Sequence, residues 1–281
     1  MKIHAAAPLA PGWTGKLWAL NEGISLASEK GVEFFWFTDA DIEHAPDTLL
    51  RLVFRAEKNS LDLASLMVLL QAKTFAERLL IPPFLYFFLL LYPPRWIADP
   101  NAATAGAAGG CILLRRNVLA PIGGIASIRG EVIDDCALAR AVKKNGGKIW
   151  LGLTRSSVSL RGYGTFAEIR DVIARTAFAQ LRYSPVLLAV ALAGLVATFL
   201  LPWIIFFAYP GEAWLLVDTA IALMTATFLM TVKFYDLSAA WALTLPFAAV
   251  FYGYATCVSA VRYWLGRGGQ WKGRAQAPRR G

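Results

Sequence analysis

The chain has 281 residues, of which 57% are hydrophobic, and a formal net charge of +9. A soluble globular domain is typically about 45–50% apolar, so the composition argues against a wholly soluble protein and predicts a membrane-embedded part. The cysteines Cys111, Cys136 and Cys257 are odd in number and match no metal-binding spacing, which argues against a disulfide framework and for reduced, cytosolic thiols. Because His4 and His44 are the only histidines, a multi-histidine zinc site and a Ser-His-Asp triad are also disfavoured.

The positive charge has two possible partners, nucleic acid and anionic lipid headgroups. The basic residues are either scattered or collected in the tail after Arg262, and no aromatic-basic motif accompanies them. Beside hydrophobic spans, a lipid-facing role is the better interpretation. We therefore expect a membrane partner and no nucleic acid.

The first part of the chain has the rhythm of an α/β domain. Residues 1–11 contain no long apolar run and no signal peptide. The pattern predicts a helix over 17–30, an apolar strand over 33–38 and a second helix over 46–58. The strand has the continuous apolar composition of a buried parallel strand.

Residues 79–92 are very apolar and are flanked or interrupted by prolines. They are too few to cross a bilayer, which takes about 20 residues, so we expect an interfacial or buried helix. A strand over 111–114, a helix over 132–144 and a strand over 148–153 complete the α/β pattern.

The charge density falls after Arg182, and three apolar spans follow: Pro185 to Tyr209, Trp214 to Val232 and Ala239 to Leu265. Each is long enough to cross the hydrocarbon core. The sequence thus predicts an α/β domain over 1–183, about three transmembrane helices over 184–265 and a basic, disordered tail over 266–281. Three spans after a cytosolic domain place the basic tail outside, against the positive-inside tendency. Either the tail is an exception to this tendency, or one segment is re-entrant, and Pro202 makes the first span the best candidate for such a segment.

Asp39-Ala40-Asp41 follows the predicted aromatic strand. Two carboxylates in a turn can hold Mg²⁺ or Mn²⁺, which prefer oxygen ligands and are usually shared with substrate phosphates. A solvated turn or a helix cap explains the same triplet. Its position at the carboxyl end of a strand, where open α/β sheets bind ligands, favours the metal.

Glu131 and Asp134-Asp135 form a second acidic cluster at the start of a predicted helix. Acidic residues are expected there because the N-terminus of a helix is positive. Crowded carboxylates also raise one another's pKa and can act as a general base, and the residues alone leave both interpretations open.

Three further motifs have two interpretations each. Gly109-Gly110 either allows a close backbone approach or ends a loop, and Arg115-Arg116 meets either phosphates or water. Gln180-Leu181-Arg182-Tyr183 either anchors the chain at the membrane interface or faces the leaving diphosphate and the acceptor.

The order of the motifs carries a family resemblance. The sequence contains G-W-x-G-K-x-x-A-L-N-x-G at 12–23, D-A-D at 39–41, G-G-C-x-L-x-R-R at 109–116, I-G-G at 122–124, D-D at 134–135 and Q-L-R-Y at 180–183. Followed by membrane spans, this set resembles the family 2 glycosyltransferases, which have a GT-A fold. Within them it looks most like the hopanoid-biosynthesis-associated glycosyltransferases and more distantly like ceramide glucosyltransferases, over about residues 8 to 265.

The resemblance implies inverting transfer of a sugar from a nucleotide-diphosphate sugar, with Mg²⁺ or Mn²⁺, to a hopanoid- or sphingolipid-like acceptor. It implies a multi-pass protein of the inner (cytoplasmic) membrane with a cytosolic catalytic domain. Asp39 and Asp41 would hold the metal, and Asp135 would be the catalytic base. The remaining substrate-binding positions would be Lys16, Gly109, Gly110, Asp134, Gln180, Arg182 and Tyr183.

Two departures from the family pattern affect these expectations. In Q-L-R-Y the spacing from Gln to Arg is one residue shorter than in Q-x-x-R-W, and Tyr replaces Trp. The family domain normally starts with a strand, a nucleotide-contacting segment and a further acidic residue upstream of the Gly-Lys helix. The resemblance therefore predicts an N-terminally incomplete domain with impaired catalysis. The alternatives are a polysaccharide synthase and a catalytically impaired membrane-bound remnant that binds or scaffolds.

Overall fold

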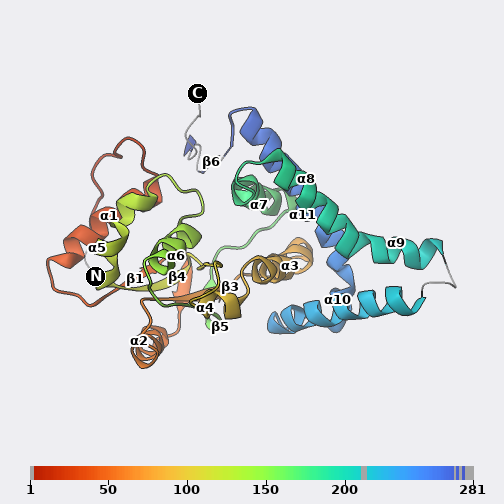
Figure 1. Cartoon of the computed structure of the whole chain (residues 1–281), viewed down its shortest axis with the longest axis horizontal. Coiled ribbons are helices and arrows are strands. Elements are labelled where there is room, and N and C mark those ends of the chain that lie inside the picture. The colour runs from red at the N-terminus through yellow and green to blue at the C-terminus, as the bar shows by residue number, and fades with distance from the viewer. Residues whose placement is uncertain (1–2, 210–213, 269, 272–273, 276–281) are drawn as a thin grey trace. The chain divides into compact units, whose positions relative to one another are not determined.

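The computed structural model describes residues 3–209, 214–268, 270–271 and 274–275, and within them the chain divides into two compact units. Of the described residues, unit 1 comprises 3–70 and 89–161, and unit 2 comprises 71–88 and those between 162 and 275. Unit 1 is mixed α/β, whereas unit 2 is helical apart from a short ladder near its end (Figure 1). The mixed α/β class and the group of apolar helices predicted from the sequence are confirmed.

Unit 1 is built around the strands β1 (Phe34–Thr38), β2 (Ile42–His44), β3 (Leu63–Leu69), β4 (Cys111–Arg115) and β5 (Ile149–Ser159). They form one sheet in the order β1-β4-β3-β5-β2. β3 and β5 pair in parallel, whereas β1 with β4, β4 with β3, and β5 with β2 pair antiparallel. The sheet is therefore mixed, with β1 and β2 at its two ends.

Helices cover both faces of this sheet. They are α1 (Gly15–Ser28), α2 (Thr48–Lys58), α4 (Pro94–Ala98), α5 (Leu119–Ile122) and α6 (Asp134–Lys144). Figure 1 shows α2 on one side of the sheet and α1, α5 and α6 on the other. α2 buries Leu52 and Ala56 in one cluster with Ala64 of β3 and Leu113 of β4. The helices predicted near 17–30, 46–58 and 132–144 are confirmed.

The prediction that residues 33–38 form a buried parallel strand is wrong in orientation. β1 is antiparallel to β4 and lies at one end of the sheet. Phe34 and Trp36 pack against the α2 cluster, while Phe35 and Phe37 alternate with them and stack on each other. An end strand with apolar side chains on both faces has the same composition as a parallel strand, so composition could not distinguish the two.

Unit 2 contains most of α3 (Phe75–Leu91), and all of α7 (Phe166–Gln180), α8 (Pro185–Leu195), α9 (Leu201–Ala208), α10 (Trp214–Phe234) and α11 (Leu245–Trp264). In the described part of the chain, three segments are long and apolar enough to cross a membrane by length and composition. They are Pro185–Ala208, Leu215–Phe234 and Ala239–Trp264, with mean hydropathies of 2.4, 1.9 and 1.4. The three predicted spans are thus helices of sufficient length, and the predicted short apolar helix is α3.

The first candidate span is interrupted by a π-helical segment, Val196–Leu200, which joins α8 to α9. Pro202 has no N–H to donate to the carbonyl four residues earlier, and a local π turn is one way in which a helix accommodates that loss. Figure 1 shows the chain bending between α8 and α9. The proline singled out in the sequence therefore bends this span.

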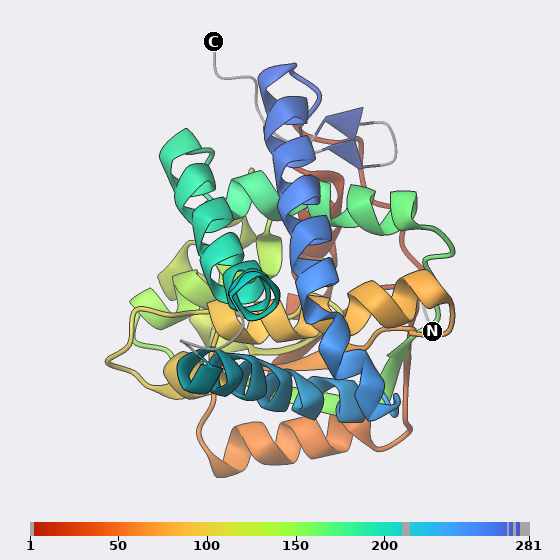
Figure 2. The same cartoon turned by 90° about the vertical axis from the view of Figure 1, so that its right-hand side faces the viewer.

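Buried polar contacts connect α11 to α7. The Ser259 hydroxyl donates to the carbonyl of Ala174 and accepts the N–H of Phe178, the latter at 3.0 Å. It therefore lies between two groups of α7 that would pair with each other in a regular helix. Leu188 of α8 joins Phe178 and Ala260 in the neighbouring apolar cluster, and Figure 2 shows α8 and α11 side by side.

Part of the tail predicted to be disordered is described. It forms the two-residue strands β6 (Gln270–Trp271) and β7 (Arg274–Ala275), which pair antiparallel. Residues 269, 272–273 and 276–281 lie outside the described residues.

α3 and α7 begin with the same tetrapeptide, Thr-Phe-Ala-Glu, at 74–77 and 165–168. In each helix the threonine hydroxyl accepts the glutamate N–H, and the glutamate carboxylate accepts the threonine N–H. This reciprocal pair is a capping box, which satisfies backbone donors that the first turn of a helix leaves unpaired.

The two glutamates differ in burial. Glu77 is 1% exposed and also accepts the N–H groups of Lys73 and Tyr163, at 2.9 and 2.6 Å, whereas Glu168 is exposed. Burial acts to raise the pKa of Glu77, but the hydrogen bonds from the backbone outweigh it and the pKa is lowered. Glu77 therefore fastens the start of α3 to the segment before α7 through its charged form.

We expect Glu77→Gln to lower the free energy of unfolding by about 2–4 kcal/mol, because an amide oxygen cannot replace a buried carboxylate with several donors. Glu168→Gln, which alters an exposed copy of the same box, should cost about 0.5–1 kcal/mol. Denaturant unfolding in detergent measures both values. The lowered pKa means that the Glu77 contribution is complete above its unfolded pKa of about 4.3 and is lost as the pH falls through the folded value. Equal losses in the two variants would contradict the assignment.

Candidate functional site

The acidic and glycine motifs meet where β1 ends and β4 begins. The antiparallel register pairs Thr38 with Cys111. Asp39 therefore follows β1 at the same end of the sheet where Gly109 and Gly110 precede β4. The turn between β1 and β2 thus lies beside the glycine segment, although the two are far apart in the sequence.

Lys16 joins this turn to the second acidic motif. It lies in the first turn of α1, after the N-cap Thr14. Its Nζ atom is 3.2 Å from Oδ1 of Asp39 and 3.2 Å from Oδ2 of Asp134. Burial acts to lower the pKa of Lys16, but the charges of Asp134, Asp39 and Asp135 outweigh it, so the pKa is raised and the ammonium stays charged.

Asp135 is held by backbone donors. Its Oδ2 accepts the N–H of Gly109 at 2.8 Å, and its Oδ1 accepts the N–H of Cys136 at 2.7 Å. Burial and the neighbouring charge of Asp134 raise the pKa of Asp135 to about 6, against the opposing effects of Lys16 and the two N–H groups. Such a carboxylate is ionised at neutral pH yet is a stronger base than an ordinary aspartate, which suits a general base.

The two glycines permit close approach. A Cβ atom on Gly109 would lie 3.0 Å from Nζ of Lys16 and 3.3 Å from Oδ2 of Asp135. A Cβ atom on Gly110 would lie 3.1 Å from a methyl carbon of Val68. The backbone at Gly109 and Gly110 thus lies close to neighbouring side chains, and both residues form the turn that precedes β4.

Thr38, His44 and Ser157, which were not predicted as site residues, form hydrogen bonds that hold the turn after β1. The Thr38 hydroxyl lies 3.1 Å from the Gly110 carbonyl and 2.8 Å from Nε2 of His44, and Nδ1 of His44 lies 2.8 Å from the Ser157 hydroxyl. One consistent arrangement has Ser157 donating to His44, His44 donating to Thr38, and Thr38 donating to Gly110. Burial lowers the pKa of His44, which favours the neutral ring that this chain requires. The rarity of histidine here was the only signal in the sequence.

Asp39 and Asp41 supply the oxygen ligands that a hard divalent cation prefers. Among the residues that the structure describes, no hydrogen bond or ion pair engages the Asp41 carboxylate, and Asp39 contacts Lys16 through one oxygen. No group of three or more His, Cys, Asp or Glu side chains in that part of the chain is arranged to hold a metal. A cation held by Asp39 and Asp41 would therefore have to take its other ligands from substrate phosphates and water.

Gln180, Arg182 and Tyr183 belong to unit 2, at the end of α7. The N–H of Arg182 donates to the carbonyl of Ala179, and that of Tyr183 donates to the carbonyl of Phe178. This pattern is a Schellman motif, whose left-handed position is usually glycine. Arg182 occupies it with φ +53°, followed by Tyr183 with φ +56°. Arg182 is exposed, and the Tyr183 ring stacks on Tyr263 at 4.3 Å.

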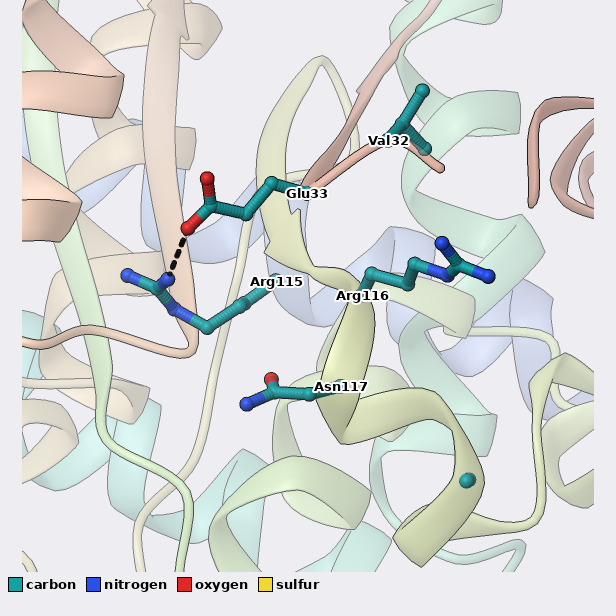
Figure 3. Close-up of a pocket in the computed structure, with 6 residues that line it drawn as sticks. Val32, Glu33, Arg115, Arg116 and Asn117 are labelled. Atoms are coloured by element: carbon teal, nitrogen blue, oxygen red, sulfur yellow. Dashed lines mark hydrogen bonds and ion pairs between the residues drawn. The ribbon is translucent and has the colours of Figure 1, made fainter. Parts of the chain in front are cut away.

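A cavity of about 440 Å³ opens at the other end of β1 and β4. Figure 3 shows Glu33 directed at Arg115 there, with Arg116 pointing away. Arg115 donates to Glu33 at 2.9 Å and to Glu57 at 2.8 Å, and it lies over the ring of Phe34. The charge of Arg115 is thus used within unit 1, and phosphate contact is not its role in this structure. The lining residues are Val32, Glu33, Arg115, Arg116, Asn117 and Ala120.

Comparison with known proteins identifies the family to which the chain belongs. Residues 8–278 match the model of Glycosyl transferase family 21, the ceramide glucosyltransferase family. No curated protein matches the chain. The prediction of a glycosyltransferase is confirmed, although the motifs had suggested family 2 with ceramide glucosyltransferases as more distant relatives. Since the match covers nearly the whole sequence, the chain belongs to glycosyltransferase family 21.

Proposed function

We propose that this protein transfers a sugar, with inversion of anomeric configuration, from a nucleotide-diphosphate sugar to a lipid at the membrane. The family supports a nucleotide-sugar donor and a lipid acceptor, and the three candidate spans support membrane association. On the motif resemblance, we propose a hopanoid- or sphingolipid-like acceptor, a GT-A fold for the catalytic part, and a cytosolic catalytic part at the inner membrane.

The observation that carries this proposal is the convergence of Lys16, Asp39, Gly109, Asp134 and Asp135 at one end of the sheet of unit 1. These residues come from four sequence segments, and the family resemblance assigned all of them to substrate, metal or catalysis. Carboxylates with a raised pKa are concentrated at catalytic sites, which supports this assignment.

In this proposal Asp135 accepts the proton of the acceptor hydroxyl. As that proton leaves, the acceptor oxygen forms its bond to the anomeric carbon, and the bond from that carbon to the diphosphate oxygen breaks on the opposite face. The N–H groups of Gly109 and Cys136 hold the two carboxylate oxygens of Asp135 and so orient the base. The glycine segment 109–110 lets the donor approach the backbone closely.

Asp39 and Asp41 would hold Mg²⁺ or Mn²⁺ in this proposal. A bound metal would supply neutralisation of the charge that develops on the leaving diphosphate. Lys16 and Asp134 would hold and orient the donor beside it.

Arg182 is proposed to contact the donor diphosphate, with Gln180 and Tyr183 as the neighbouring substrate-binding positions. Its backbone conformation supports a role for the side chain. A left-handed non-glycine residue costs roughly 1–2 kcal/mol, and glycine would relieve that cost at a Schellman position. An exposed arginine in such a place is better explained by what its guanidinium binds than by the stability of α7.

The direct test is an assay of the purified chain in lipid nanodiscs with nucleotide-diphosphate sugars and Mn²⁺, offering hopanoid and ceramide acceptors. We expect a glycolipid whose anomeric configuration is opposite to that of the donor. A polymer as the product would indicate the polysaccharide synthase alternative. Binding of the donor without any transfer would indicate the scaffold alternative.

Asp135→Asn should lower turnover by about 10²–10⁴-fold, the usual contribution of a general base, with donor affinity nearly unchanged. Because the base must be ionised, wild-type turnover should fall as the pH drops below about 6, the raised pKa of Asp135. Asp134→Asn removes a charge that raises this pKa, so it should move that limb of the pH profile to lower pH. Near-normal turnover in Asp135→Asn with loss in Asp134→Asn would show that the base is assigned to the wrong residue.

Arg182→Gly should stabilise the fold and impair the reaction. We expect the free energy of unfolding to rise by about 0.5–1 kcal/mol, because strain relief exceeds the added freedom of glycine in the unfolded chain. Transfer should fall at least about 10-fold through loss of a charge-assisted contact to phosphate. The matched control, Arg182→Ala, should lose the same activity without the gain in stability. If Arg182→Gly kept full activity, the arginine would have no part in donor binding.

A further inference from the structure

Lys16 is a cation in a place where its own helix disfavours one. It lies in the first turn of α1, and the N-terminus of a helix carries positive partial charge. The carboxylates offset this, because Nζ is 3.2 Å from Asp39 and 3.2 Å from Asp134. A cation thus already neutralises one member of the Asp39–Asp41 pair.

A divalent cation at this pair needs the same carboxylate. The Oδ1 atom of Asp39 that faces Lys16 is an oxygen ligand that Mg²⁺ or Mn²⁺ would use. Two cations at hydrogen-bond distance from one carboxylate repel each other strongly in a half-buried site, where the effective dielectric constant is about 20. Lys16 and the metal therefore compete for Asp39.

Lys16 has another anchor if it leaves Asp39. Asp134, whose side chain is 20% exposed, contacts the same ammonium. The missing side chain of Gly109 leaves room beside Nζ, since a Cβ atom there would lie only 3.0 Å from it. The ammonium can therefore release Asp39 and keep an ion pair.

We propose that Lys16 is an internal counter-ion that holds Asp39 in the free protein and releases it to the divalent cation that accompanies the donor. The inference rests on the proposed function, because it assumes that Asp39 and Asp41 take a metal. On binding, Lys16 stays with Asp134 and gains the donor diphosphate as a new partner. The site then favours a metal bound to diphosphate over free metal, because only the former offers the displaced ammonium an anion.

The test is Mn²⁺ binding to the whole chain in detergent without any donor, followed by electron paramagnetic resonance of the free ion. Lys16→Met should bind Mn²⁺ roughly 10-fold or more tightly than the wild type, because removing a unit charge this close relieves a strong repulsion. Lys16→Arg, which keeps the charge, should bind within a few fold of the wild type. Lys30→Met, which neutralises an exposed lysine just beyond the other end of α1, should change the affinity less than about twofold.

A second variant keeps the test informative if Lys16→Met folds poorly. Asp134→Asn leaves Asp39 as the remaining ion-pair partner of Lys16 and should weaken Mn²⁺ binding, the opposite direction. Equal or weaker binding in Lys16→Met than in the wild type would overturn the inference while leaving the proposed function standing. If neither protein bound Mn²⁺, the metal role of Asp39 and Asp41 would fail together with the inference.

Discussion

The charge balance around Lys16 is the constraint on which the rest of the site depends. Three carboxylates, those of Asp39, Asp134 and Asp135, act on one ammonium. Without the ammonium, mutual repulsion would push them apart or force protonation. With it, Asp134 and Asp39 are tied to the start of α1, and Asp135 keeps the intermediate proton affinity that a base requires. One ion-pair centre thus fixes the relative positions of a helix start, a strand end and a second helix start.

The antiparallel pairing of β1 with β4 is what makes this centre possible. Because Thr38 pairs with Cys111, the last residue of β1 lies beside the first residue of β4, at the same end of the sheet. The Thr38–His44–Ser157 chain then holds the turn after β1 against β5. If β1 were parallel to β4, Asp39 would lie at the other end of the sheet, beside Arg115 and away from the glycine segment.

The sequence could predict those features that have a local signal. Asp39-Ala40-Asp41, Asp134-Asp135 and the helices over 17–30 and 132–144 rest on adjacent residues or on helical periodicity, and unit 1 does bring the acidic motifs together through Lys16. The orientation of β1 had no such signal, because pairing partners are set by segments far away in the chain. The same holds for the His44 brace and for the left-handed Arg182, whose conformation depends on how α7 ends. The type of each element could thus be predicted from the sequence, whereas the strand partner of β1, the contacts of His44 and the strained backbone of Arg182 could not.

Glu77 and Asp135 show what distinguishes a structural carboxylate from one that is suited to chemistry, because burial acts on both but their pKa values shift in opposite directions. Glu77 accepts the backbone N–H groups of Lys73, Thr74 and Tyr163, and its pKa is lowered despite burial. Asp135 accepts only two backbone N–H groups and has Asp134 beside it, and its pKa is raised to about 6. The difference lies in the number of donors and the sign of the neighbouring charge, since burial acts in the same direction on both. A carboxylate that accepts several backbone hydrogen bonds is stabilised in its charged form, which suits a structural role. Asp135, under-supplied with donors beside another carboxylate, retains the proton affinity that chemistry can use.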